Sequence, residues 1–161
     1  MHRVAQFFGH LAARVSDDDA ALARRILPES AWPLFADMPV ADRRHGLDVA
    51  AGLLASGWDD TDLLAAALLH DAAKGRRMRL WHRVGGVLLD ALAPSLLRRL
   101  ASDDPASAGY PWHLHLHHAE LSARAALGAG CSRRTAEFIS GRAAGADAAA
   151  AAALHAADEA A

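Results

Sequence analysis

Three places in the sequence hold residues that could bind a metal ion, and the sharpest is the adjacent pair His70–Asp71 in ALLHDAAK. His45 lies within RRHGLDVA, and Asp158 lies within LHAADEA near the end of the chain. Imidazole is the commonest metal ligand in proteins, and carboxylate is a hard oxygen donor. Because the residues before the pair are apolar on every side of a helix, Asp71 is expected to be buried. A buried carboxylate needs a cation or a hydrogen-bonding partner, and a divalent metal would satisfy both side chains.

A local interpretation of the same pair stays open. In it, His70 hydrogen-bonds to a neighbouring group and Asp71 faces solvent beside Lys74, three residues along. For an isolated His-Asp dipeptide this is the commoner situation, so the weight of the metal hypothesis comes from where the pair lies and from what precedes and follows it.

The elements that must position these residues are all predicted to be helical. Ser16 is a predicted N-cap followed by three aspartates, Gly57 and Gly128 are predicted to end helices, and Pro28 and Pro94 are predicted to stop them. A loop rich in Asp, Pro, Ser and Gly is expected over residues 102–112. The predicted helices cover residues 4–15, 17–27, 29–35, 41–56, 61–70, 81–92, 118–127, 132–141 and 146–161. No segment has the pattern of a sheet, so the fold class is predicted to be all-α.

Composition restricts the class of protein further. The 161 residues are 53% hydrophobic and 22% charged, with a net charge of −2, which is globular and gives no basic excess for binding a nucleic-acid duplex. No apolar run approaches the ~20 residues of a membrane span, and no secretory leader is evident. The single cysteine, Cys131, is read as a small buried residue in a reducing compartment. These features predict a cytoplasmic protein with no membrane partner.

The order of these residues resembles the HD superfamily of metal-dependent phosphohydrolases. In that order a histidine comes first, a His-Asp pair follows an apolar helix, and an aspartate comes late in the chain. The resemblance runs from Met38 to the C-terminus and is strongest in MPVADRRHGLDVAAGLLASG, DDTDLLAAALLHDAAKG and HHAELSARAALGAG. It is closest to the small stand-alone bacterial HD proteins. There is also some likeness to the HD-type enzymes that split dinucleoside polyphosphates symmetrically.

The resemblance implies a single HD-type helical bundle over residues 1–161, in which residues 1–37 form an N-terminal helical extension. It also implies one divalent transition metal, Mn, Fe, Ni or Zn, as the cofactor. The ligands that it implies are His45, His70, Asp71 and Asp158.

The resemblance implies only an incomplete second metal site. Two-metal members of the family have two further histidines, and the first corresponds to His118. The second is expected near the end of TAEFISGR, where this chain has Gly141 and Arg142, and arginine cannot ligate a metal. Arg142 is therefore either a binding group for substrate phosphate or a residue that points to solvent.

Two other polar clusters have alternative interpretations. In WHLHLHH, a strand would place His113, His115 and His117 on one face as an independent zinc site, but an extended or helical entry to the cleft is preferred. Lys74 is predicted to bind phosphate, and most of the basic residues after it are predicted to be solvated. That basic cluster is Arg76, Arg77, Arg79, His82 and Arg83.

The function that follows is metal-assisted hydrolysis of a small phosphorylated molecule or nucleotide, either a phosphomonoester or a nucleotide-like substrate. Asp71 would act as ligand and catalytic residue, Lys74 would stabilise charge on the phosphate, and His118 would position it. The alternative is an HD-fold metal- or ligand-binding regulatory module without turnover. A helical interaction protein is a third hypothesis, and a homodimer remains open.

Overall fold

The helix that precedes the His-Asp pair, α5 (Thr61–Leu69), lies among the other helices and is buried from Leu63 to Leu69. It contacts α2 (Asp17–Ile26), α3 (Trp32–Asp37), α4 (Val40–Ala55), α8 (Tyr110–Gly128), α9 (Arg133–Ile139) and α10 (Ala148–Ala160). A helix that is apolar all round can only be stable in such a position. The prediction that this segment forms the centre of the molecule is confirmed.

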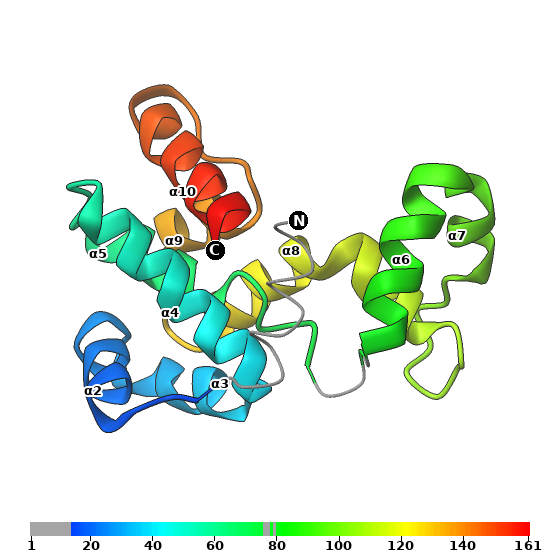
Figure 1. Ribbon diagram of the computed structural model, residues 1–161, viewed down its shortest axis with the longest axis horizontal. Helices are drawn as coiled ribbons and strands as arrows, with labels where there is room; N and C mark the ends of the chain where they lie inside the picture. The colour runs from blue at the N-terminus through cyan, green and yellow to red at the C-terminus, as the bar shows by residue number, and fades with distance from the viewer. Residues whose placement is uncertain (1–13, 76–77, 79) are drawn as a thin grey trace.

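The computed structural model describes residues 14–75, 78 and 80–161 (Figure 1). Over these residues it consists of nine α-helices and two short 3-10 helices, with no strand, which confirms the all-α prediction. The remaining elements are α6 (Leu80–Leu92), α7 (Pro94–Leu100) and 3-10 turns at Glu29–Ala31 and Gly145–Asp147. None of the described helices has both the length and the apolarity that crossing a bilayer requires.

Some predictions lie outside the described residues. They are the helix expected over residues 4–15, except for its last two residues, and the basic residues Arg76, Arg77 and Arg79, together with the side chain of Arg83.

Several helix ends have the capping groups that the sequence predicts. The Ser16 hydroxyl accepts a hydrogen bond from the N–H of Asp19, whose carboxylate in turn accepts from the N–H of Ser16, so a capping box begins α2. Asp60 caps α5 by accepting from the N–H of Leu63 at 3.0 Å. Gly57 follows α4 with a φ of +84°, a conformation that favours glycine.

One helix was missed and one boundary differs from the prediction, and proline is involved in both cases. Helix α6 ends at Leu92, just before Pro94, as predicted, but Pro94 also begins α7, which was not predicted. The long loop was expected to reach residue 112, but α8 already begins at Tyr110 with Pro111 in its first turn. The first turn of a helix needs no N–H donor from proline, so a proline there starts a helix as readily as it stops one.

Helices α6 and α7 form a hairpin that lies on the far side of α8 from α4, α5 and α10 (Figure 1). Two adjacent glycines let α6 approach α8 closely. A methyl group added at Gly86 would lie 2.7 Å from Nδ1 of His115, and one added at Gly85 would lie 3.1 Å from the ring of Trp112. Both helices of the hairpin contact α8, and Leu97 of α7 is fully buried.

Candidate metal centre

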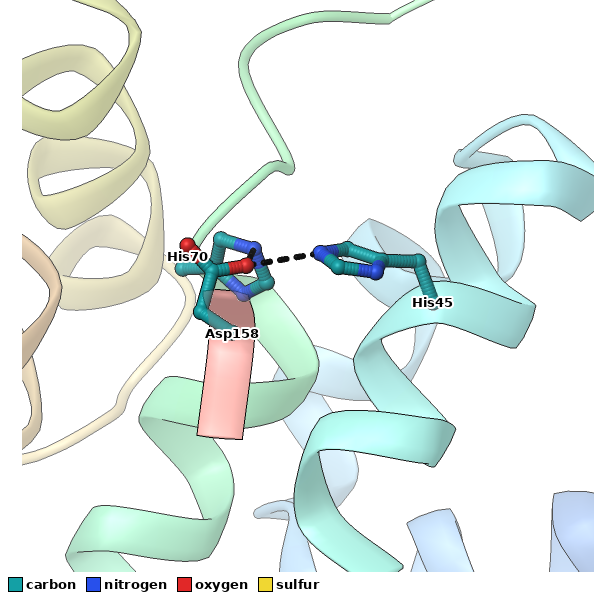
Figure 2. A group of neighbouring side chains, drawn as sticks. All are labelled: His45, His70 and Asp158. Atoms are coloured by element: carbon teal, nitrogen blue, oxygen red, sulfur yellow. Dashed lines mark hydrogen bonds and ion pairs between the residues drawn. The ribbon is translucent and has the colours of Figure 1, made fainter. Parts of the chain in front are cut away.

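Three helices far apart in the sequence bring His45, His70 and Asp158 together (Figure 2). His45 lies on α4, His70 is the C-cap residue of α5, and Asp158 lies on α10. Oδ1 of Asp158 is 2.8 Å from Nε2 of His45 and 3.3 Å from Nε2 of His70. One ligand atom from each residue lies within 4.8 Å of the other two, a spacing that a single ion could bridge. Among the described residues, this is the group of three that could hold a metal.

The position of His45 depends on the glycine that follows it. At Gly46 the backbone of α4 approaches that of α5, and an added methyl group would lie 3.0 Å from the carbonyl oxygens of Ala67 and Leu68. The absence of a side chain at this crossing lets His45 approach His70, and the two rings lie edge to face with centroids 5.2 Å apart.

The ring of His70 is oriented by its own helix. Nδ1 lies 2.9 Å from the carbonyl oxygen of Ala67, so Nδ1 is assigned as the donor and Nε2 faces the cluster. A backbone partner on one ring nitrogen is the usual way in which proteins orient a histidine ligand. The arrangement thus presents the Nε2 atoms of His45 and His70 to one carboxylate oxygen of Asp158.

Asp71 is buried, with 3% of its surface exposed, so the interpretation in which it faces solvent is wrong. Its Oδ2 accepts a hydrogen bond from Nζ of Lys74 at 2.7 Å. Oδ1 is also 2.7 Å from that nitrogen, yet it receives no hydrogen bond. This buried oxygen lies 3.7 Å from Nε2 of His70 and 4.0 Å from Nε2 of His118. A buried carboxylate oxygen that is paired with an ammonium and lies near two imidazoles is a possible further ligand for a cation.

Electrostatics favour ionised carboxylates at this site. Burial opposes the charge of Asp71, but the Lys74 ammonium and the His70 imidazole outweigh it and lower the pKa of Asp71 to about 2. Burial likewise opposes the charge of Asp158, whose pKa is nevertheless held well below its usual value by hydrogen bonds from His45 and His70. The pKa of His70 is raised, because the contacts with Asp158 and Asp71 outweigh the effect of burial. These contacts favour the protonated form of the His70 ring, and metal binding, which needs a free Nε2, would compete with that proton.

The structure places His118 near the cluster and Arg142 elsewhere. His118 approaches Asp71 from α8, and burial together with the nearby Lys74 lowers the pKa of His118, which is therefore neutral at pH 7. Arg142 donates a hydrogen bond to Glu120 at 2.8 Å, with 61% of its side chain exposed. Of the two expected phosphate-binding cations, only Lys74 contacts the His-Asp pair.

The histidine-rich stretch is helical, so the arrangement of three histidines on one face of a strand does not form. Helix α8 instead separates them: His113 and His117 lie one turn apart with ring centroids 4.5 Å from each other, and His115 packs against Gly86. His118 alone is directed toward Asp71.

One residue that supports the site was not predicted. Ser122 on α8 is fully buried, and its Oγ accepts a hydrogen bond from the backbone N–H of Ala73 at 3.0 Å. This bond anchors the turn that follows His70–Asp71. The two residues are 49 positions apart, and a serine in an alanine-rich helix carries no signal of such a contact.

Comparisons of the chain with known proteins found no match. No family model matches it, and no curated protein or solved structure does either. Interpretation of the site therefore rests on its own residues.

Proposed function

We propose that this chain is a metal-dependent phosphohydrolase that acts on a small phosphomonoester or nucleotide-like substrate. The observation that carries the proposal is the convergence of His45, His70 and Asp158 beside the buried carboxylate of Asp71, whose Oδ1 has no hydrogen bond. Two imidazoles and two ionised carboxylates form a ligand set suited to a divalent transition metal such as Mn, Fe, Ni or Zn.

The donor chemistry fits one ion better than two. His45, His70, Asp71 and Asp158 would hold it, and His118 belongs to no further group of three possible ligands among the described residues. When bound, such an ion polarises a phosphoryl oxygen and lowers the pKa of a coordinated water.

The chain's own groups supply the other requirements of hydrolysis. Oδ1 of Asp71 has no hydrogen bond and can accept one from an attacking water, which orients that water. The Lys74 ammonium, 2.7 Å from both oxygens of Asp71, is placed to donate to a non-bridging phosphate oxygen as well. Nδ1 of His118 donates to the carbonyl oxygen of His115 at 2.9 Å, so in neutral His118 the Nε2 atom is unprotonated and can accept a hydrogen bond from an attacking water.

The proposal is tested by metal content and turnover measured together. Protein incubated with Mn, Fe, Ni or Zn and then desalted is expected to retain about one ion per chain and to hydrolyse some members of a panel of phosphomonoesters and nucleotides. The variants His70→Ala and Asp158→Asn are expected to lose at least ~10–100-fold in metal affinity. His155→Ala is the matched control, because His155 also lies on α10 but is 74% exposed and pairs only with Glu159.

Each outcome separates the candidates. Retention of metal without hydrolysis of any substrate would favour the regulatory binding module over the enzyme. Failure to retain any of the four metals would exclude both. The exposed, Glu120-paired position of Arg142 is the observation that keeps the binding module as the second candidate, since that cation does not complete a phosphate site.

A further inference from the structure

The α6–α7 hairpin exposes most of the large apolar side chains found on the surface of the described residues. Ten large hydrophobic residues are more than about a third exposed there, and seven of them belong to these two helices. Leu92 is 81% exposed and Trp81 is 59% exposed. The full set is Trp81, Val84, Val87, Leu88, Leu92, Leu96 and Leu100. We refer to these seven residues as the hairpin face.

The helical spacing shows that this exposure is not incidental. Trp81, Val84, Leu88 and Leu92 follow one another at intervals of three or four residues, so they share one side of α6. The closest approach to α8 is at Gly86, which lies about 120° around the helix from Leu92. Trp81 and Gly85 border the exposed side and meet the ring of Trp112. The molecule therefore uses one side of α6 for its own packing and leaves a second apolar side uncovered.

The uncovered area is large for a monomer. The exposed fractions of the seven residues correspond to roughly 700 Å² of accessible surface, which exceeds the ~300–600 Å² of the largest apolar patch on a typical monomer. It approaches the ~800 Å² that each partner contributes to a standard protein–protein interface. The face is thus of the size that one copy of a stable homodimer must offer.

The charges at this end of the molecule suit a second copy of the same chain. Asp90, Arg98 and Arg99 are exposed on the hairpin and include both signs. In a two-fold interface each copy presents the same residues. Asp90, the one acidic residue of the hairpin, lies on the side of α6 toward His115 of α8, so the apolar side of α6 has no acidic group that a second copy would bury. The net charge of −2 gives little long-range repulsion between copies. Two helical hairpins packed on their apolar sides make a four-helix bundle.

We propose that a second copy of this chain covers the hairpin face, so that the protein is a homodimer joined through α6 and α7. The proposal is independent of the proposed hydrolase activity, because none of the seven residues belongs to the metal centre.

Sedimentation velocity of the full chain tests the proposal directly. The wild type at about 100 μM is expected to sediment as a species of twice the 17.0 kDa chain mass. Leu92→Glu and Val84→Glu place a charge in the face and are expected to weaken the dimer by ~100-fold or more. Leu127→Glu is the control, since Leu127 on α8 is 46% exposed outside the hairpin and its variant should remain dimeric. Circular dichroism verifies that each variant keeps its helix content.

Cross-linking identifies the surface independently of stability. The only native cysteine, Cys131, is buried, so a cysteine introduced at position 88 or 92 would be the one accessible thiol. Near a two-fold axis, Leu88→Cys or Leu92→Cys is expected to form a disulfide-linked dimer under mild oxidation, and Leu127→Cys is not. Equal cross-linking at all three positions would show random collision and overturn the proposal.

Measurements on the same purified protein distinguish a second copy from two other possible occupants of the hairpin face. A wild type that is monomeric at 100 μM overturns the proposal. Residues 1–13 of the same chain would then be one alternative occupant of the hairpin face. An anionic bilayer is the other alternative, because the sequence just before α6 contains three basic residues, Arg76, Arg77 and Arg79. These three residues are not part of the hairpin face. Co-sedimentation of a monomer with phosphatidylserine-containing vesicles, abolished by Leu92→Glu, would also overturn the dimer.

Discussion

At the scale of single residues, Asp71 shows how the chain keeps a charge inside an apolar core. Its carboxylate is 3% exposed, and its nearest cation is Lys74, three residues along and 2.7 Å away. An isolated carboxylate in this position would take up a proton rather than remain ionised. Because Lys74 and His70 offset the cost of burial, the site is ready to attract a cation before any metal arrives.

The lowered pKa of Asp71 predicts a specific acid sensitivity in metal-free protein. A carboxyl whose pKa falls from 3.8 to about 2 on folding stabilises the fold above pH 4, and this stabilisation is lost as pH falls toward 2. The shift corresponds to about 2 kcal/mol. Urea unfolding of the chelator-treated wild type and Asp71→Asn, compared at pH 6 and pH 3, should give a difference in stability that shrinks at the lower pH. A constant difference would mean that Asp71 is not ionised by Lys74 and His70.

The residues of the candidate metal centre could be predicted because their order along the chain is informative, whereas the contacts of their neighbours could not. His45, His70 and Asp158 carry a sequence signal, and the structure brings them together. The pairing of Arg142 with Glu120 depends on how α8 packs against the segment after α9, and no local sequence pattern predicts that packing.

At the scale of secondary-structure elements, the crossing of α4 and α5 controls the distance between two ligands. Gly46 lies next to His45 and has only 3.0 Å of room before the backbone of α5, which is fully buried and cannot yield easily. The closeness of the two helices, rather than any property of the histidines, places the rings within reach of one ion.

Gly46→Ala is expected to destabilise the fold by about 1–3 kcal/mol, because the added methyl group forces the two helices apart. It should also weaken metal binding, since His45 moves away from His70. The control is Gly52→Ala on the same helix, where the nearest atom is Cβ of Ala157 at 3.8 Å and the substitution should be neutral or stabilising by about 0.5–1 kcal/mol. Thermal unfolding and metal titration of both variants measure the two effects; equal behaviour would contradict the close crossing.

Elements with capping residues were predicted well, and elements that begin with proline were not. Ser16, Asp60 and Gly57 each have a local geometric role that the sequence reveals. Pro94 and Pro111 are compatible with either the start or the end of a helix, and only packing against the neighbouring helices decides between them.

At the scale of the whole molecule, the candidate metal centre would join segments that are distant in the chain. His45 and Asp158 are 113 residues apart, and the contact between them holds the last helix against α4. The alanine-rich α10 buries Ala150 and Leu154 and packs further alanines against the core, and the polar contacts of Asp158 add to this attachment.

A bound metal is therefore expected to stabilise the fold and to protect α10 in particular. At a metal concentration 100-fold above the dissociation constant, binding contributes about 2.7 kcal/mol. For a chain of this length that is roughly a 5–10 °C rise in melting temperature. Hydrogen exchange should slow most in α10 when metal is added, and Asp158→Asn should abolish the effect. Uniform slowing along the chain would indicate binding at another place.

The burial of α5 on all sides also bears on how freely this chain can vary. Most helices tolerate substitution with a rhythm of three to four residues, since one side faces water, and α4 has this rhythm with Gly46, Leu47, Val49, Ala50 and Leu53 inside. In α5 every residue from Leu63 to Leu69 is inside. A scan of all single substitutions should therefore find seven consecutive intolerant positions, Leu63 to Leu69, immediately before His70–Asp71. This block has no periodicity, and its sequence can change only slowly.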